Sequence, residues 1–259
     1  MPTKISLQPS LVSTPNGEIL ACGGLNNEQK CLELKDNQWK EHSNLNKKRY
    51  RASAVSMKNG VYIFSGDKTK NTWEWLPDGE NKWQIGTCSI PNTFEEGCAV
   101  KINDEEILLI GGWQTFKRVL KFNTITKSFT NLGDVLKQVG KYGHACTRFE
   151  DKVIVTGGTK GYPYFTDSAS TEIIHINDLT TTYTTGSLVQ ARSYPGLVVV
   201  HVENKPTVLA VGGSNDMNVL DSIEMWNPIN ETWTMTSMKL SEPRFNFGIL
   251  SLPTRSLCP

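Results

Sequence analysis

The residue types that carry metal or covalent chemistry are few in this 259-residue sequence. Four histidines are spread along it: His42, His144, His175 and His201. None of them belongs to an HxH or HxxxH pair, although metal sites usually need several such ligands to converge. GxSxG, P-loop and GxGxxG motifs are absent, and the adjacent carboxylates Glu95-Glu96 and Glu105-Glu106 are typical of solvated surface. We therefore expect no catalytic residue, no metal and no other cofactor.

Basic residues recur at one position, just before a series of similar short apolar stretches. They are Arg49, Arg51, Lys141, Arg192 and Arg244. If the fold gathers these side chains around one opening, their guanidinium groups could grip an acidic peptide through bidentate contacts with carboxylates. In the alternative interpretation, the arginines brace neighbouring elements through backbone carbonyls. Glu95-Glu96 takes this position in one copy, so a basic ring would be lopsided.

An internal repeat defines the elements that must position these residues. Five apolar runs end in Gly or Gly-Gly, at Ile19–Gly24, Val61–Gly66, Ile107–Gly112, Val153–Gly158 and Val208–Gly213. A second alternating segment, a polar turn and an aromatic residue follow each run, and one more apolar stretch precedes it. The aromatic residues are Trp39, Trp83, Phe129, Tyr183 and Trp233. Four short antiparallel strands in about 45 residues predict a β-propeller.

The repeats predict one all-β domain over residues 1–259, with about five four-stranded blades. Their approximate ranges are 10–42, 50–86, 96–132, 142–186 and 194–238, and 244–252 would form an extra first strand. In one interpretation this strand completes the first blade, which closes a five-bladed ring and leaves residues 1–15 as an arm. In the other, the chain is an incomplete six-bladed ring. The second is favoured because Ser10–Gly17 is itself a plausible first strand and hairpin.

The repeat resembles the Kelch motif, in which a glycine doublet is followed by a Trp about 15 to 20 residues later. The resemblance covers nearly the whole chain, and residues 197–233 match best. Ser65 replaces the first glycine of the second copy, and Phe129 and Tyr183 replace Trp in the third and fourth. WD40 repeats share the period, but their Gly-His and Trp-Asp pairs are missing.

The loops that leave one face of the predicted propeller vary while the scaffold repeats, and together with the basic residues they predict a non-catalytic module that binds a protein or an acidic peptide there. Many Kelch propellers recognise substrates for cullin-type ubiquitin ligases, a role expected here only if BTB and BACK domains lie outside this chain. An insertion in the fourth copy carries aromatic residues of the kind that anchor interfaces. The predicted partner-binding residues are Arg49, Arg51, Lys141, Arg192, Arg244, Tyr162, Tyr164 and Phe165.

Two alternatives stay open. Galactose oxidase and its relatives are Kelch-like propellers that bind copper through Tyr and His and carry a cross-linked Cys. The resemblance to them draws attention to Cys98, Tyr142, His144 and Cys146, although these residues also fit as the lining of a channel. The other alternative is a secreted propeller that binds glycans.

Charge and cysteine usage indicate the partners and the compartment. Lys+Arg number 27 and Asp+Glu number 26, so the net charge of +1 argues against nucleic-acid and membrane partners. Residues 1–10 lack the basic and apolar regions of a signal peptide, and a cytoplasmic protein, with cytoskeletal association as one variant, is favoured over a secreted one. We expect the six cysteines to be reduced, buried thiols, because a domain of this size needs no disulfides.

Overall fold

The computed structural model describes residues 8–66, 69–138, 142–160, 165–202, 204–216 and 218–251, which hold strands and turns but no helix. The strands form five four-stranded antiparallel sheets, called blades 1 to 5 in chain order, and one two-stranded sheet. Within each blade the strands pair in the order of the sequence, so every blade is one contiguous segment.

Each blade has strands of two to eight residues. Blade 1 comprises β1 (Ser10–Ser13), β2 (Ile19–Cys22), β3 (Cys31–Lys35) and β4 (Gln38–His42). Blade 2 comprises β5 (Ser53–Met57), β6 (Gly60–Phe64), β7 (Trp73–Pro77) and β8 (Gln84–Ile85). Blade 3 comprises β9 (Cys98–Lys101), β10 (Glu106–Ile110), β11 (Arg118–Asn123) and β12 (Ser128–Asp134). Blade 4 comprises β13 (Tyr142–Phe149), β14 (Lys152–Thr159), β15 (Thr171–His175) and β16 (Asp178–Thr184). Blade 5 comprises β17 (Gly196–Val202), β18 (Lys205–Val211), β21 (Ser222–Asn227) and β22 (Thr232–Lys239), with β19 (Ser214–Asn215) and β20 (Asn218–Val219) as a separate hairpin.

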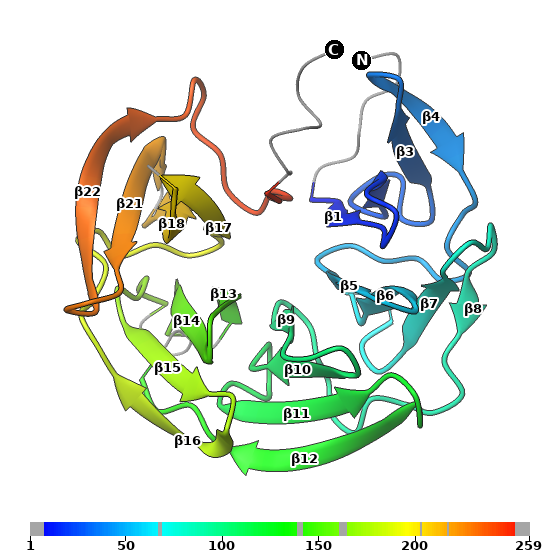
Figure 1. Cartoon of the computed structure of the whole chain (residues 1–259), viewed down its shortest axis with the longest axis horizontal. Helices are drawn as coiled ribbons and strands as arrows, with labels where there is room; N and C mark the ends of the chain where they lie inside the picture. The colour runs from blue at the N-terminus through cyan, green and yellow to red at the C-terminus, as the bar shows by residue number, and fades with distance from the viewer. Residues whose placement is uncertain are drawn as a thin grey trace.

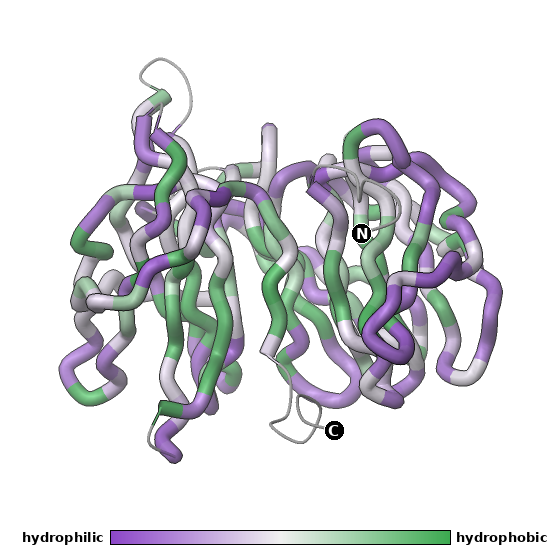
Figure 2. Tube along the Cα trace, turned by 90° about the horizontal axis from the view of Figure 1, so that it is seen from above, coloured by the Kyte–Doolittle hydropathy of each residue, from purple (hydrophilic) through white to green (hydrophobic). Residues whose placement is uncertain are grey.

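The blades stand around a central axis, with the first strand of each blade innermost and the fourth outermost (Figure 1). The innermost strands of consecutive blades contact one another, from β1 to β5, β9, β13 and β17. Hydrophobic segments run through the middle of the blades, and hydrophilic ones cover the turns (Figure 2). The predicted all-β propeller is confirmed, with five blades.

Aromatic side chains fill the wedges between neighbouring blades. Between blades 2 and 3, the buried Trp73 ring meets Phe122 edge-on, with ring centroids 4.8 Å apart. Between blades 4 and 5, Trp233 packs against Trp226 and donates its Nε1–H to Oγ1 of Thr171 at 3.0 Å. A large apolar surface with one satisfied polar atom is therefore buried at these interfaces.

In blades 1, 4 and 5, the glycine doublet is hydrogen-bonded to the loop that follows the blade. The second glycine donates its N–H to the carbonyl of an arginine in that loop: Gly24 to Arg49 (2.8 Å), Gly158 to Arg192 (2.9 Å) and Gly213 to Arg244 (2.8 Å). The first glycine, as at Gly157 (φ +76°), lies so close that a Cβ there would stand 2.5 Å from the carbonyl oxygen of Arg192. A side chain at residue 157 would displace the Arg192 loop, so Gly157 is needed for its space as well as its dihedral angle, whereas blade 2 has Ser65 (φ +59°) at the equivalent position.

The first and last described segments meet at the opening between blades 5 and 1. Ser10–Ser13 pairs with β2, so blade 1 takes its first strand from the N-terminal segment and not from residues 244–252. The described part of that segment, residues 244–251, forms no strand. It lies between β17 and β1 instead, where a Cβ on Gly248 would stand 2.2 Å from Cβ of Leu11, and one on Gly196 would stand 3.0 Å from Ile249. Both ends of the described chain lie at this opening (Figure 1).

Four of the six cysteines are bonded in pairs, Cys22 with Cys31 and Cys98 with Cys146. The expectation of reduced thiols throughout is therefore wrong. The first pair joins neighbouring strands of one blade, whereas the second joins the innermost strands of blades 3 and 4. In the part of the chain that is described, no helix has the length and apolar character needed to span a bilayer.

Gly157→Ala tests the contact between blades 4 and 5. Gly79 is the matched control, because it has nearly the same φ (+75°) but nothing lies within 4 Å of the place a Cβ would take. We expect Gly79→Ala to lower the free energy of unfolding by about 1 kcal/mol through backbone strain alone. Gly157→Ala should lower it by about 3 kcal/mol, because the Cβ also displaces the Arg192 loop. Urea unfolding followed by tryptophan fluorescence measures both values, and equal losses would contradict the steric account.

Candidate functional site

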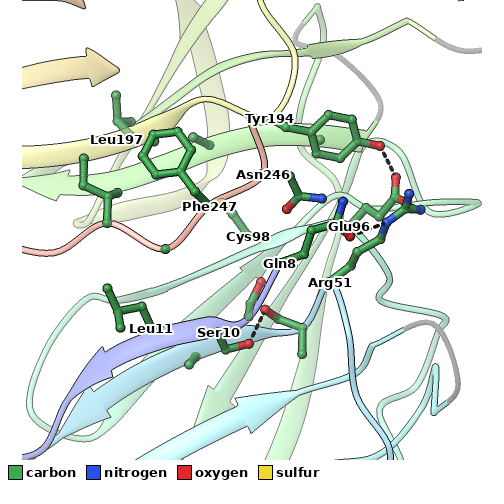
Figure 3. Close-up of a pocket in the computed structure, with 18 of the residues that line it drawn as sticks. Gln8, Ser10, Leu11, Arg51, Glu96, Cys98, Tyr194, Leu197, Asn246 and Phe247 are labelled. Atoms are coloured by element: carbon green, nitrogen blue, oxygen red, sulfur yellow. Dashed lines mark hydrogen bonds and ion pairs between the residues drawn. The ribbon is translucent and has the colours of Figure 1, made fainter. Parts of the chain in front are cut away.

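A cavity of about 230 Å³ lies on the axis, where the innermost strands converge. All five blades and the segment after blade 5 line it. Its walls are mostly small or apolar side chains, among them Leu11, Ala54, Ala99, Leu197 and Phe247. Figure 3 shows the polar side chains gathered on one side of this cavity.

Six residues surround this polar end, which we call the mouth ring. They are Gln8, Arg51, Glu96, Gly143, Tyr194 and Asn246, and all of them have a positive φ between 49° and 65°. Four of them stand two residues before the first strand of blades 1, 2, 3 and 5. The left-handed conformation thus recurs at equivalent positions and turns different side chains toward the axis.

Backbone hydrogen bonds link part of the mouth ring from blade to blade. Asn246 N–H donates to the carbonyl of Tyr194 at 3.0 Å, and Tyr194 N–H donates to that of Gly143 at 2.6 Å. Gly143 N–H in turn donates to the carbonyl of Glu96 at 2.9 Å. A positive φ raises the conformational energy of a non-glycine residue by about 1 to 3 kcal/mol. These bonds help to hold the ring in place.

Side-chain bonds cross the mouth between three blades. The Tyr194 hydroxyl donates to Oε2 of Glu96 at 2.5 Å, and the Arg51 guanidinium pairs with Oε1 of the same carboxylate (Figure 3). Arg51 Nε also donates to Oε1 of Gln8 at 3.4 Å. Burial, reinforced by the charge of Glu96, raises the pKa of Tyr194, so its hydroxyl remains a neutral donor at physiological pH.

A second cavity of about 230 Å³ lies among the turns of blades 1 and 2. Its polar side chains include exposed turn residues such as Asn16 and Asp78, which bond to each other at 3.1 Å. Only two blades line this cavity, whereas the whole ring converges on the axial one. The axial cavity and its mouth ring are therefore the candidate site.

The structure places two of the predicted arginines in the interior. Arg49 and Arg192 are 1% and 0% exposed, and each forms an ion pair with a buried glutamate of its own blade, Glu74 at 3.0 Å and Glu224 at 2.6 Å. Arg192 Nη1 also donates to the carbonyl of Gly212 at 2.7 Å. These two side chains brace backbone inside the blades and present no guanidinium at the surface.

The other predicted residues are spread out. Of the described ones, only Arg51 reaches the mouth, while the half-exposed Arg244 lies 3.7 Å from Glu242, and Phe165 is exposed. Lys141, Tyr162 and Tyr164 lie outside the described residues. Among the described residues, therefore, these basic side chains do not gather into a ring, and partner contacts by the exposed ones stay a prediction.

Sequence reasoning missed the other side chains of the mouth ring. Glu95 and Glu96, expected on solvated surface, are only 6% and 9% exposed. Tyr194 and Asn246 each follow a repeated arginine by two residues, as Arg51 does. That spacing is the signal that could have found them, although the residue types at the position differ.

The residues to which the resemblance to copper oxidases drew attention, around Cys98, His144 and Cys146, do not form a metal site. Cys98 and Cys146 are bonded to each other, and Nε2 of His144 lies 3.0 Å from the carbonyl oxygen of Ile110, to which it can only donate. Among the residues that the structure describes, no group of three or more His, Cys, Asp or Glu side chains could hold a metal ion. We therefore derive no chemistry through copper at this site.

A family model for the Kelch motif matches residues 192–237, which span blade 5. Together with the five repeated blades, this match supports a Kelch-type propeller. The chain is a five-bladed β-propeller whose fifth blade matches the Kelch motif. The resemblance noted in the sequence is thereby confirmed, while no curated protein matches the chain significantly.

Two solved structures share the fold of this Kelch propeller. One is a fungal alcohol oxidase of the AA5 family in complex with copper, with a TM-score of 0.70 and 17% identity over 92% of this chain and 54% of that one. The other is YjhT, with a TM-score of 0.79 and 12% identity over 96% of this chain and 89% of that one. This chain spans about half the length of the oxidase, and at these identities the likeness shows the fold alone.

These neighbours correct the predicted function. The predicted non-catalytic protein-interaction module is wrong as a conclusion, because a copper alcohol oxidase has the same fold. The Kelch fold does not fix the function, since structures of this fold include an alcohol oxidase. The cytoplasmic location and the absence of nucleic-acid and membrane partners stay predictions.

The buried ion pairs can be tested with Arg192→Leu. This variant leaves the Glu224 carboxylate buried without its guanidinium partner, so we expect a loss of about 3 to 5 kcal/mol in the free energy of unfolding. Arg244→Leu is the matched control, since its side chain is exposed and its ion pair is long. It should cost less than about 1 kcal/mol. Equal losses in chemical denaturation would show that Arg192 does not brace the blade.

Proposed function

We propose that the protein binds a small, uncharged molecule carrying several hydroxyl groups at the mouth of its axial cavity. The observation that carries the proposal is the convergence of Arg51, Glu96 and Tyr194, from three different blades, over one cavity of about 230 Å³. Sites for small molecules are concave, with apolar walls and a few polar groups that fix orientation.

The charges at the mouth favour a neutral ligand. Arg51 and Glu96 are the two ionised side chains of the described lining, and they neutralise each other. A charged ligand would therefore have to break this pair to find a partner, and breaking it would leave one charge uncompensated at a partly buried site.

The hydrogen-bonding groups suit hydroxyls. The amides of Gln8 and Asn246 can each donate and accept, as a hydroxyl does, and the Glu96 carboxylate accepts only. Both amides lie beside the Arg51–Glu96 pair (Figure 3). The apolar walls formed by Leu11, Leu197 and Phe247 offer contact to the C–H faces of such a molecule.

The mouth ring is preorganised for binding. Four of its residues stand two residues before the first strand of a blade, and backbone hydrogen bonds link Glu96, Gly143, Tyr194 and Asn246, so little ordering has to accompany ligand binding. The proposal concerns binding and assigns no reaction to the site.

Saturation-transfer NMR with named probes tests the proposal. We expect signals from glucose and myo-inositol, and weaker ones from their charged counterparts gluconate and glucosamine. Glu96→Gln should weaken binding of the best probe by about ten- to a hundredfold, because it removes a charged hydrogen-bond acceptor. Glu41→Gln, an exposed change in blade 1, is the control and should change nothing.

Tyr194→Phe provides a second variant in case Glu96→Gln fails to fold. Unfolding curves establish which variants are folded before binding is measured. Absence of binding for all four probes, or unchanged binding by both folded variants, would overturn the proposed site.

A further inference from the structure

We propose that Cys98 and Cys146 form a thiol-exchange site in the wall of the axial cavity, open to low-molecular-weight thiols. The inference goes beyond the proposed binding of a hydroxylated molecule and does not depend on it. It rests on the position of this disulfide relative to the cavity and on the contrast with the other disulfide of the same chain.

The two disulfides differ in their access to solvent. Cys22 and Cys31 are 1% and 0% exposed, and they join two neighbouring strands inside blade 1. Cys98 and Cys146 are both partly exposed and both line the axial cavity. A thiolate can therefore reach the second pair through the cavity, whereas it can reach the first only after blade 1 opens.

The second disulfide also joins parts of the chain that are distant in sequence. Cys98 stands on β9 and Cys146 on β13, 48 residues apart, with Cα atoms separated by 6.0 Å. This Cα separation suits a disulfide. The bond thus links blade 3 to blade 4 beside the axis. Cys98 follows Glu96 of the mouth ring by two residues.

The exchange balances as two thiol–disulfide steps. A small thiolate RS⁻ attacks one sulfur of the pair and forms a mixed disulfide, while the other cysteine leaves as a thiolate and takes a proton from water. A second RS⁻ attacks the sulfur of the small thiol in the mixed disulfide, which releases RS–SR and the second cysteine thiolate. The disulfide is reduced by two electrons, and two RSH are oxidised to one RS–SR.

The size of the cavity selects the reductant. A volume of about 230 Å³ admits a molecule such as free cysteine but not a folded reductase. Small thiols should therefore react with this pair faster than a thioredoxin-class protein at equal thiol concentration, because the sulfurs lie on the cavity wall and not on an outer surface.

Differential alkylation of the native, air-oxidised chain tests this inference. The protein is incubated with free cysteine, samples are quenched with iodoacetamide at intervals, and peptides are identified by mass spectrometry. We expect Cys98 and Cys146 to become alkylated at least about tenfold faster than Cys22 and Cys31. Species carrying one added cysteine on Cys98 or Cys146 should appear first.

Controls keep the outcomes distinct. Cys88→Ser, which removes the partly exposed free thiol, should leave the rates unchanged. Cys146→Ser should leave Cys98 able to form a mixed disulfide with added cystine. Equal or reversed rates for the two pairs, faster reduction by the thioredoxin-class protein, or alkylation of Cys98 and Cys146 before any thiol is added would each overturn the proposal.

Discussion

Three of the five blades depend on a buried carboxylate in the third strand, and the equivalent position in blades 1 and 3 is Leu32 and Leu120. Glu74, Glu172 and Glu224 stand at equivalent positions of blades 2, 4 and 5, and all three are 0% exposed. Each accepts backbone N–H groups from the loop that enters its own blade, for instance from Val189 at 2.6 Å and Gln190 at 3.1 Å for Glu224. A charge buried so completely is tolerated only when its lone pairs are satisfied, so the carboxylate imposes one conformation on the loop.

This constraint reaches the axis through a short series of contacts. In blade 5, Glu224 holds the loop that contains Arg192. The Arg192 carbonyl accepts the N–H of Gly158 from blade 4, and the Arg192 guanidinium donates a hydrogen bond to the Glu224 carboxylate. Two residues later the chain takes a positive φ at Tyr194 and turns its side chain into the mouth ring. The same interaction that stabilises the blade therefore positions a residue of the candidate site.

The sequence predicts the blades because the residues that build them recur in type. Glycines recur where blades meet, with Ser65 as the exception, and aromatic side chains recur in the wedges, so both residue types repeat with a recognisable period in the sequence. The mouth ring leaves none, since its backbone conformation repeats while Arg51, Glu96 and Tyr194 share no chemistry. The sequence does not predict the Cys98–Cys146 bond either, because this bond depends on which strands become neighbours at the axis. The burial of Arg49 was also not predictable from the sequence, because its ion pair with Glu74 forms only when distant parts of the chain come together in the fold.

The mouth has six positions although the chain has five blades. Asn246 follows Arg244 as Tyr194 follows Arg192, and its N–H continues the backbone bonds around the axis, yet no strand ladder supports it. The segment after blade 5 thus occupies the place of one more first strand, between β17 and β1. Gln8 and Asn246, the two amides of the mouth, both come from the ends of the described chain. Because no blade depends on these side chains, the chemistry of the mouth can change while the fold persists, which explains in physical terms why the propeller alone does not fix the function.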